Sequence, residues 1–174
     1  IACHTNREAR MVALVNLYSP NGPSPDIEKE VAAAQDFHEH FAGIARPGVN
    51  AASAAIKLAD AYRHQGEELR KAVKDTSNDK KIQACYAKAS KVYNELVVEL
   101  AKEDSKYVSA STERDNAKRL LETALYQLGT CMQRMPTSGN AKLEKAFKTK
   151  AEAYFNDYLK QFPKGELAPR AMLQ

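Results

Sequence analysis

The strongest constraint on the fold is the spacing of the apolar residues, which recur every three or four positions along most of this chain of 174 residues. That spacing gathers apolar side chains on one face of an α-helix, whereas a half-buried strand shows strict alternation of apolar and polar residues. No segment of the sequence alternates in this way. The sequence therefore predicts an all-α protein.

Helix-breaking residues divide this pattern into successive segments. Proline and glycine occur in 19–25, 45–48, 136–139 and 163–165, and the polar run 75–79 makes a further break. Helices end there because proline cannot continue a helix and glycine tolerates left-handed geometry. The expected helices cover roughly 6–18, 25–44, 50–74, 82–100, 117–135 and 143–162, and a seventh begins in 166–174.

Three of these segments lead to specific expectations. Ser24 is the expected N-cap of the second helix, whose apolar stripe continues to Ile44. The fourth helix has the broadest apolar face, so it should pack against two neighbours. The last segment should pack on aromatic residues of the sixth helix: Leu167, Ala171 and Met172 on Tyr154, Tyr158 or Phe162.

The short breaks between long amphipathic helices make sequential neighbours antiparallel. Two architectures have this connectivity, an open α-solenoid built from helical hairpins and a closed helix bundle. The length fits one domain over 1–174, with a short helix and a proline-rich loop in 1–24 and helical hairpins over 51–174.

Two stretches of the chain resemble the tetratricopeptide repeat. Leu125-Tyr126-Gln127-Leu128-Gly129 is similar to the first helix of that repeat, in which Leu-Gly lets a partner helix approach closely. Ala151, Phe155 and Pro163 match the small, aromatic and proline positions of its second helix, and 58–67 is similar to another first helix and turn. Gly129 and Ala151 lie 22 positions apart, where the repeat has about 12.

The run 158–171 is similar to a form frequent in bacterial cell-envelope repeat proteins, among them the periplasmic tol-pal coordinator and the barrel-assembly lipoprotein. The resemblance implies a TPR-like α-solenoid, with the closed bundle as the alternative. It also implies a protein-binding role in a bacterial cell envelope or periplasm. A cytoplasmic location is the alternative.

The three cysteines, Cys3, Cys85 and Cys131, are an odd number at long spacings, which excludes a dense disulfide framework and any CxxC motif. Cys85 and Cys131 lie on apolar stripes, where we expect inert core thiols. Ile1-Ala2-Cys3 is open to two interpretations, an ordinary fragment boundary or the tail of a bacterial lipobox with lipidation at Cys3. Such an anchor would be the membrane contact, because no apolar run is long enough to span a bilayer.

Charge and motifs exclude several classes of function. The 26 basic and 22 acidic residues are interspersed and leave a net charge of +4, so we expect no nucleic-acid partner. The sequence has no GxSxG, HExxH or phosphate-binding glycine loop, so we expect neither an enzyme nor a bound cofactor. Asp36 and His40 lie one helical turn apart, but His38 points to the other side, which favours surface histidines over a metal site.

Tyrosines supply the candidate partner-binding residues. Five of them lie on or beside the apolar stripes, where the rings can pack and the hydroxyl groups can reach a groove edge. Core packing is one interpretation, and a tyrosine-lined concave face for a protein partner is the other. The five residues are Tyr62, Tyr86, Tyr93, Tyr154 and Tyr158.

Taken together, these patterns favour a non-enzymatic scaffold or adaptor that binds one or more protein partners. Rigid helices would present aromatic and charged side chains to the partner at low ordering cost. The alternative is a structural or accessory subunit, whose helices are covered by other chains of a larger assembly.

Overall fold

The computed structural model describes the backbone of residues 2–72 and 76–174, and within these ranges the side chains from Arg7 onward. The described residues contain helices and no β-strand, so the prediction of an all-α protein is confirmed. In chain order the elements are α1 (Ala2–Tyr18), α2 (Ile27–Glu39), α3 (Gly48–Ala72), η1 (Thr76–Asn78), α4 (Asp79–Leu100), η2 (Ser111–Glu113), α5 (Arg114–Gln133), α6 (Ala141–Gln161) and α7 (Ala168–Ala171).

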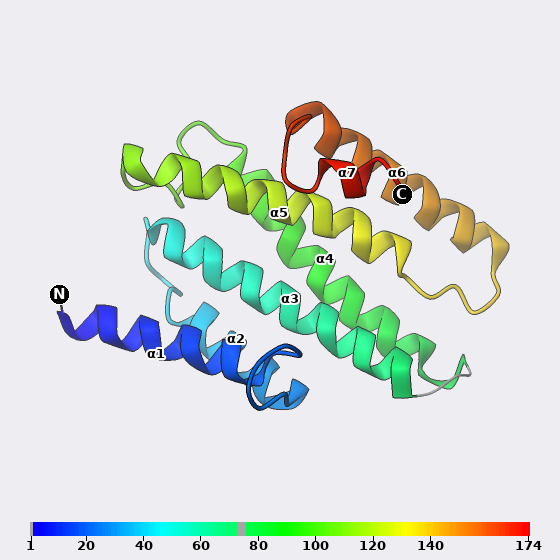
Figure 1. Ribbon diagram of the computed structural model, residues 1–174, viewed down its shortest axis with the longest axis horizontal. Helices are drawn as coiled ribbons and strands as arrows, with labels where there is room; N and C mark the ends of the chain where they lie inside the picture. The colour runs from blue at the N-terminus through cyan, green and yellow to red at the C-terminus, as the bar shows by residue number, and fades with distance from the viewer. Residues whose placement is uncertain (1, 73–75) are drawn as a thin grey trace.

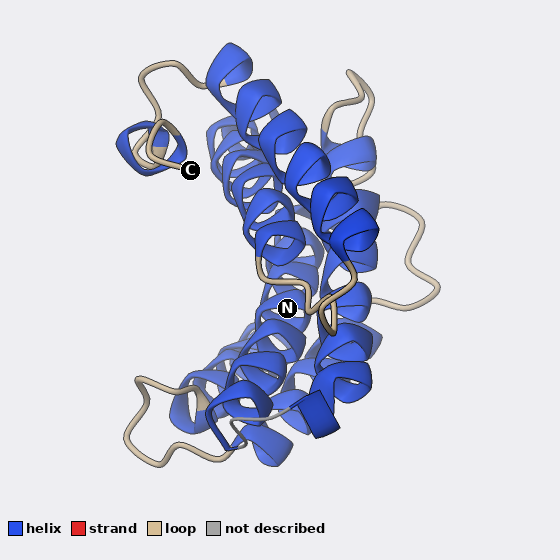
Figure 2. Ribbon diagram, turned by 90° about the vertical axis from the view of Figure 1, so that its right-hand side faces the viewer, coloured by secondary structure: helices blue, strands red, loops and turns tan. Residues whose placement is uncertain are grey.

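Consecutive helices pack against each other as antiparallel neighbours, from α1 on α2 to α6 on α7, and α3 additionally contacts α5. In Figure 1, α4 passes behind α5 and α2 lies partly behind α1. The view from the side shows that the helices form a curved array (Figure 2). Helices α1 and α6 are not among the pairs that pack extensively, so the two ends of the array lie apart.

Helix α3 is the centre of the array, because α2, α4 and α5 all pack on it. Its small residues make this possible, since alanine and glycine let several helices approach one backbone closely. The sequence pattern indicated a single stripe, whereas most of the N-terminal half of α3 is buried. The buried residues of α3 are Gly48, Ala51, Ala52, Ala54, Ala55, Ile56, Leu58, Ala59, Ala61 and Gly66.

Helix α2 is shorter at both ends than the sequence pattern predicted. Its N-cap is Asp26, whose Oδ1 accepts a hydrogen bond from the amide of Lys29 at 3.1 Å, so the prediction that Ser24 is the cap is wrong. The amide of Ser24 instead donates to the carbonyl of Leu17, which holds this loop against the end of α1. The helix ends at Glu39, and Ile44 is 49% exposed rather than part of the core.

The end of the chain packs on α6 largely as predicted. Leu167 and Ala171 belong to an apolar cluster that also contains Tyr158 and Phe162. Met172 does not take part, since its side chain is 68% exposed. The helix itself, α7, is only four residues long.

Glycines mark the closest approaches within two helical hairpins. A Cβ added to Gly129 of α5 would lie 2.7 Å from Cε1 of Phe155 in α6. A Cβ added to Gly66 of α3 would lie 3.3 Å from Cε2 of Tyr86 in α4. The first separation is a clash and the second is a tight contact, so the two glycines should respond differently to substitution.

We expect Gly129→Ala to lower the free energy of unfolding by up to about 2 kcal/mol. Overpacking against the buried Phe155 ring costs roughly 1–3 kcal/mol, and the better helix propensity of alanine offsets about 1 kcal/mol of that cost. Gly66→Ala is the matched control, with an expected change close to zero because the same propensity gain meets a milder contact. Urea denaturation of both variants checks this, and equal effects would contradict the assigned helix packing.

Candidate functional site

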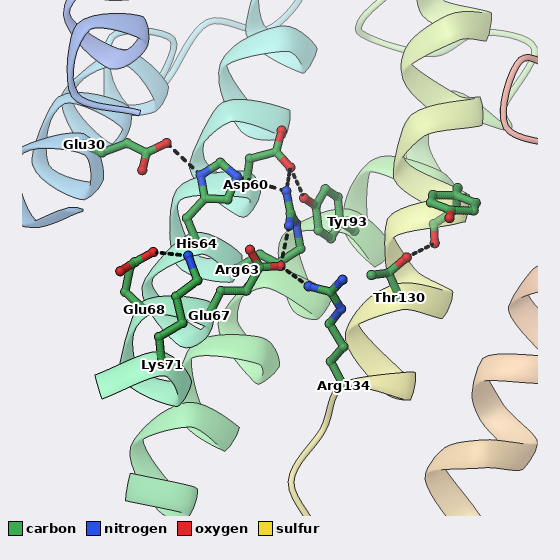
Figure 3. Close-up of polar contacts among 11 residues, drawn as sticks. Glu30, Asp60, Arg63, His64, Glu67, Glu68, Lys71, Tyr93, Thr130 and Arg134 are labelled. Carbon is green, nitrogen blue, oxygen red and sulfur yellow. Dashed lines mark hydrogen bonds and ion pairs between the residues drawn. The ribbon is translucent and has the colours of Figure 1, made fainter. Parts of the chain in front are cut away.

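A cluster of charged and polar side chains lies where α2, α3, α4 and α5 meet, and we call it the polar cluster (Figure 3). Four of its members share one face of α3 because they are spaced three or four positions apart. The other members come from α2, α4 and the residue that follows α5. The polar cluster consists of Glu30, Asp60, Arg63, His64, Glu67, Tyr93 and Arg134.

Arg63 is the central member of the polar cluster. Its Nη1 donates to Oε1 of Glu67 at 2.7 Å, and its Nη2 lies 3.2 Å from Oδ1 of Asp60. The Arg63 side chain is only 13% exposed. Burial by itself lowers the pKa of Arg63, but Tyr93, Asp60 and Glu67 outweigh burial and raise the pKa above its ordinary value. The guanidinium is therefore a fixed positive charge inside the array.

Tyr93 of α4 supplies a neutral donor to this charged group. Its ring is fully buried, and its hydroxyl group donates to Oδ1 of Asp60 at 2.6 Å. Burial, reinforced by the negative charge of Asp60, raises the pKa of Tyr93 well above the ordinary value. Tyr93 thus stays protonated and holds Asp60 in place.

The hydrogen bonds of His64 determine which of its ring nitrogens donates. Nη2 of Arg63 lies 3.0 Å from Nε2 of His64, and Nδ1 of His64 lies 2.9 Å from Oε1 of Glu30. A guanidinium can only donate, so Nε2 must accept and the ring proton must be on Nδ1. In this arrangement Nδ1 of His64 donates a hydrogen bond to Oε1 of Glu30.

This arrangement leaves the charges of the polar cluster unevenly paired. Asp60 and Glu67 face the guanidinium groups of Arg63 and Arg134, because Arg134 also donates to Glu67. Glu30 is only 2% exposed, and its other oxygen, Oε2, has no hydrogen-bond donor among the described residues. A buried carboxylate with a free oxygen is costly, and Glu30 is the member of the cluster with an unused acceptor. Nε of Arg63 is likewise buried without a hydrogen-bond partner among the described residues.

The two described thiols are core groups rather than nucleophiles. Cys85 and Cys131 are both buried, as the sequence predicted. Burial raises the pKa of Cys85, and burial raises the pKa of Cys131 to about 12, although Arg63 and Ser90 act in the opposite direction. Both side chains are therefore protonated near neutral pH, and a thiol nucleophile must be ionised to react.

The structure separates the five predicted partner-binding tyrosines into two groups. Tyr86, Tyr93 and Tyr158 are fully buried, so core packing describes them and their interpretation as partner-binding residues is not kept. Tyr158 fixes the turn after α6, because its hydroxyl group donates to Glu122 at 2.6 Å and accepts from the amide of Leu167. Tyr62 and Tyr154 are partly exposed.

The remaining sequence candidates lie away from the polar cluster. His40 lies 3.7 Å from Glu8 and stacks edge-on against Phe41. Among the described residues, no three His, Cys, Asp or Glu side chains gather in a way that could hold a metal ion. Cys3, the lipidation candidate, falls outside the side chains that the structure describes.

Sequence reasoning missed the polar cluster, although part of its signal was present. Asp60, Arg63, His64 and Glu67 have the spacing of one helical face, within the segment 58–67 that resembles a repeat helix. The partners on α2, α4 and α5 follow no local pattern. Their positions depend on how the helices pack.

Comparisons with known proteins add no identification. No protein-family model matches the chain, and neither a curated protein sequence nor a solved structure matches it. None of the described helices is both long and apolar enough to cross a membrane.

Proposed function

We propose that this protein is a non-enzymatic scaffold that binds a protein partner through a TPR-like array of helical hairpins. The observation that carries the proposal is the curvature of the array of antiparallel helices, whose ends lie apart (Figure 2). Curved helical arrays offer an extended, rigid surface, so binding to them costs little conformational entropy.

The close helix contacts support a repeat-like design. Gly129 contacts the ring of Phe155, and these two residues occupy the glycine and aromatic positions of the repeat resemblance. Gly66 contacts the ring of Tyr86 in the preceding hairpin, so the same kind of glycine–aromatic contact occurs twice. The solenoid architecture remains part of the proposal.

The polar cluster supports recognition of a partner rather than chemistry. Its charges are held by hydrogen bonds from several helices, and Arg134, at its edge, has a side chain that is 47% exposed. Fixed charges of this kind favour one partner over others, because a wrongly charged partner is repelled. Two further parts of the proposal, the cell-envelope location and the lipidation of Cys3, rest on sequence resemblance alone.

A structural subunit is the second candidate, and exposed apolar side chains favour it. Leu173 is 85% exposed and Val98 is 57% exposed. Covering either side chain with another chain would remove apolar surface from water. Under this alternative, the molecular mass measured by light scattering should rise with protein concentration.

Capture of partners from the native source tests the scaffold proposal. We expect the unaltered protein to retain a discrete partner and Arg134→Glu to retain at least tenfold less of it, because the substitution reverses an exposed charge of the polar cluster. Lys148→Glu, which reverses an exposed charge on α6, is the matched control and should retain the partner. Equal capture by all three proteins would remove the polar cluster from the proposal, and concentration-dependent self-association without capture would favour the structural subunit.

A further inference from the structure

A cavity of about 250 Å³ opens beside Glu30, between the loop that joins α1 to α2 and the C-terminal half of α3. Pro20, Pro25 and Ile27 give it apolar walls, and Asp26, Glu30 and Glu68 contribute carboxylates. Small-molecule sites typically occupy roughly 300–1,000 Å³, so this cavity is better suited to a single side chain.

The free oxygen of Glu30 is an unused acceptor, so a ligand in the cavity should carry a hydrogen-bond donor. Figure 3 shows this oxygen turned away from His64, toward the side of α3 that carries Glu68 and Lys71. The described residues offer it no hydrogen-bond donor, and water does not reach it. Glu30 lines the cavity, and the last torsion of its side chain has a broad energy profile, so its carboxylate can adjust to a cation there.

The cations already present at the cavity are paired with carboxylates other than Glu30. Nζ of Lys71 lies 2.7 Å from Oε1 of Glu68, and Nζ of Lys29 lies 2.9 Å from Oδ2 of Asp26. The nearest guanidinium, that of Arg63, reaches Glu30 only through the ring of His64. Among the described residues, then, the negative charge of Glu30 has no cation of its own.

The geometry favours a lysine over an arginine as the missing cation. An arginine binds a carboxylate best through two parallel hydrogen bonds, but one oxygen of Glu30 is already occupied by His64. A lysine ammonium is a compact charge that needs only one oxygen, and its methylene groups suit apolar walls. The ring of Tyr18 also lines the cavity, and Nζ of Lys29 already lies 5.5 Å from its centroid, so this ring is placed where it attracts a cation.

We propose that this cavity binds a lysine side chain of the partner polypeptide, with the ammonium group on Glu30 and the methylene groups against Pro20, Pro25 and Ile27. This inference rests on the proposed function only for the statement that the lysine belongs to a partner protein. The cavity itself can be tested with a short peptide, independently of any captured partner.

The test is a titration of the isotope-labelled full chain with the peptide acetyl-Gly-Lys-Gly-amide, followed by amide chemical shifts. We expect saturable shifts at Tyr18, Ile27 and Glu30. The same peptide with Nε-acetyl-lysine or with arginine should bind at least tenfold more weakly. Equal binding of either control peptide would overturn the proposal, and this comparison needs no altered protein.

Three variants test whether the lysine peptide binds at Glu30. Glu30→Gln should weaken lysine binding at least tenfold, because it removes the charge with little change of shape. Lys71→Gln should strengthen binding severalfold, because it removes a competing ammonium group from the cavity. Glu122→Gln is the matched control, since Glu122 also accepts from another side chain, that of Tyr158, and lies outside the cavity; its affinity should be unchanged.

The peptide titration and the partner capture test the lysine site and the scaffold proposal separately. Unchanged affinity in Glu30→Gln, or loss of binding in Lys71→Gln, would overturn the lysine site. Specific peptide binding without any captured partner would keep the site and remove the scaffold proposal. Partner capture without peptide binding would keep the scaffold proposal and remove the lysine site.

Discussion

Arg63→Ala is expected to lower the free energy of unfolding by about 3 kcal/mol. The substitution leaves Asp60 without a guanidinium and removes one of the two that bind Glu67. Breaking a buried ion pair in this way costs roughly 3–5 kcal/mol, and the low end applies because the two carboxylates keep side-chain exposures of 28% and 22%. Urea denaturation followed by far-ultraviolet circular dichroism measures the change.

Arg134→Ala is the matched control for this prediction. Arg134 binds the same Glu67, but its side chain is 47% exposed, so we expect a loss of at most about 1 kcal/mol. Arg63→Lys should fall between the two, because an ammonium keeps the charge but cannot reach both carboxylates in the same planar fork. A loss as small for Arg63→Ala as for Arg134→Ala would mean that Arg63 is not the centre of the polar cluster.

Cys131 and Tyr93 together should cost the protein about 4 kcal/mol of stability between neutral pH and about pH 11. Cys131 and Tyr93 are neutral when protonated, and burial raises the pKa of each in the folded protein, to about 12 for Cys131. The unfolded chain releases these protons near the ordinary pKa values of 9.0 and 10.0, while the folded protein keeps them. Stability is therefore complete below about pH 9 and falls as the pH rises toward the folded values, by about 1.4 kcal/mol per pH unit for each group.

Urea denaturation at a series of alkaline pH values checks this expectation. Cys131→Ala should reduce the decline between pH 9 and 10, because Tyr93 begins to contribute only above the ordinary pKa of a tyrosine. Cys85, whose pKa burial also raises, accounts for the decline that remains in this range. The variant is less stable throughout, since it leaves a small cavity, so the slope rather than the absolute value is compared. A stability that is the same at pH 8 and pH 11 would show that neither group is buried in the protonated form.

Helix type and most helix positions could be predicted from the sequence because they are determined locally. The threefold and fourfold apolar spacing of α4 places Ile82, Cys85 and Leu96 on one face whatever the neighbouring helices are, and all three are buried. The breaks at 136–139 and 163–165 likewise act on the backbone of their own segment. Antiparallel packing of sequential helices follows from the short connections.

The helix ends and the extent of burial were decided by tertiary contacts. The loop before α2 bonds back to the last turn of α1, so the helix begins after Asp26 and not after Ser24. Helix α3 is buried far beyond one stripe because α2, α4 and α5 all pack on it. The sequence of α3 shows that its residues are small, but it does not predict how many helices pack against them.

The candidate site depended on the tertiary structure most of all. The sequence alone places Asp60, Arg63, His64 and Glu67 on one helical face, because the period of the helix determines that arrangement. It does not bring Tyr93 or Arg134 to that face, and it gives no reason to expect a buried glutamate at position 30. Hydrogen bonds between side chains 30 or more positions apart require the packed helices, since only packing determines which faces meet.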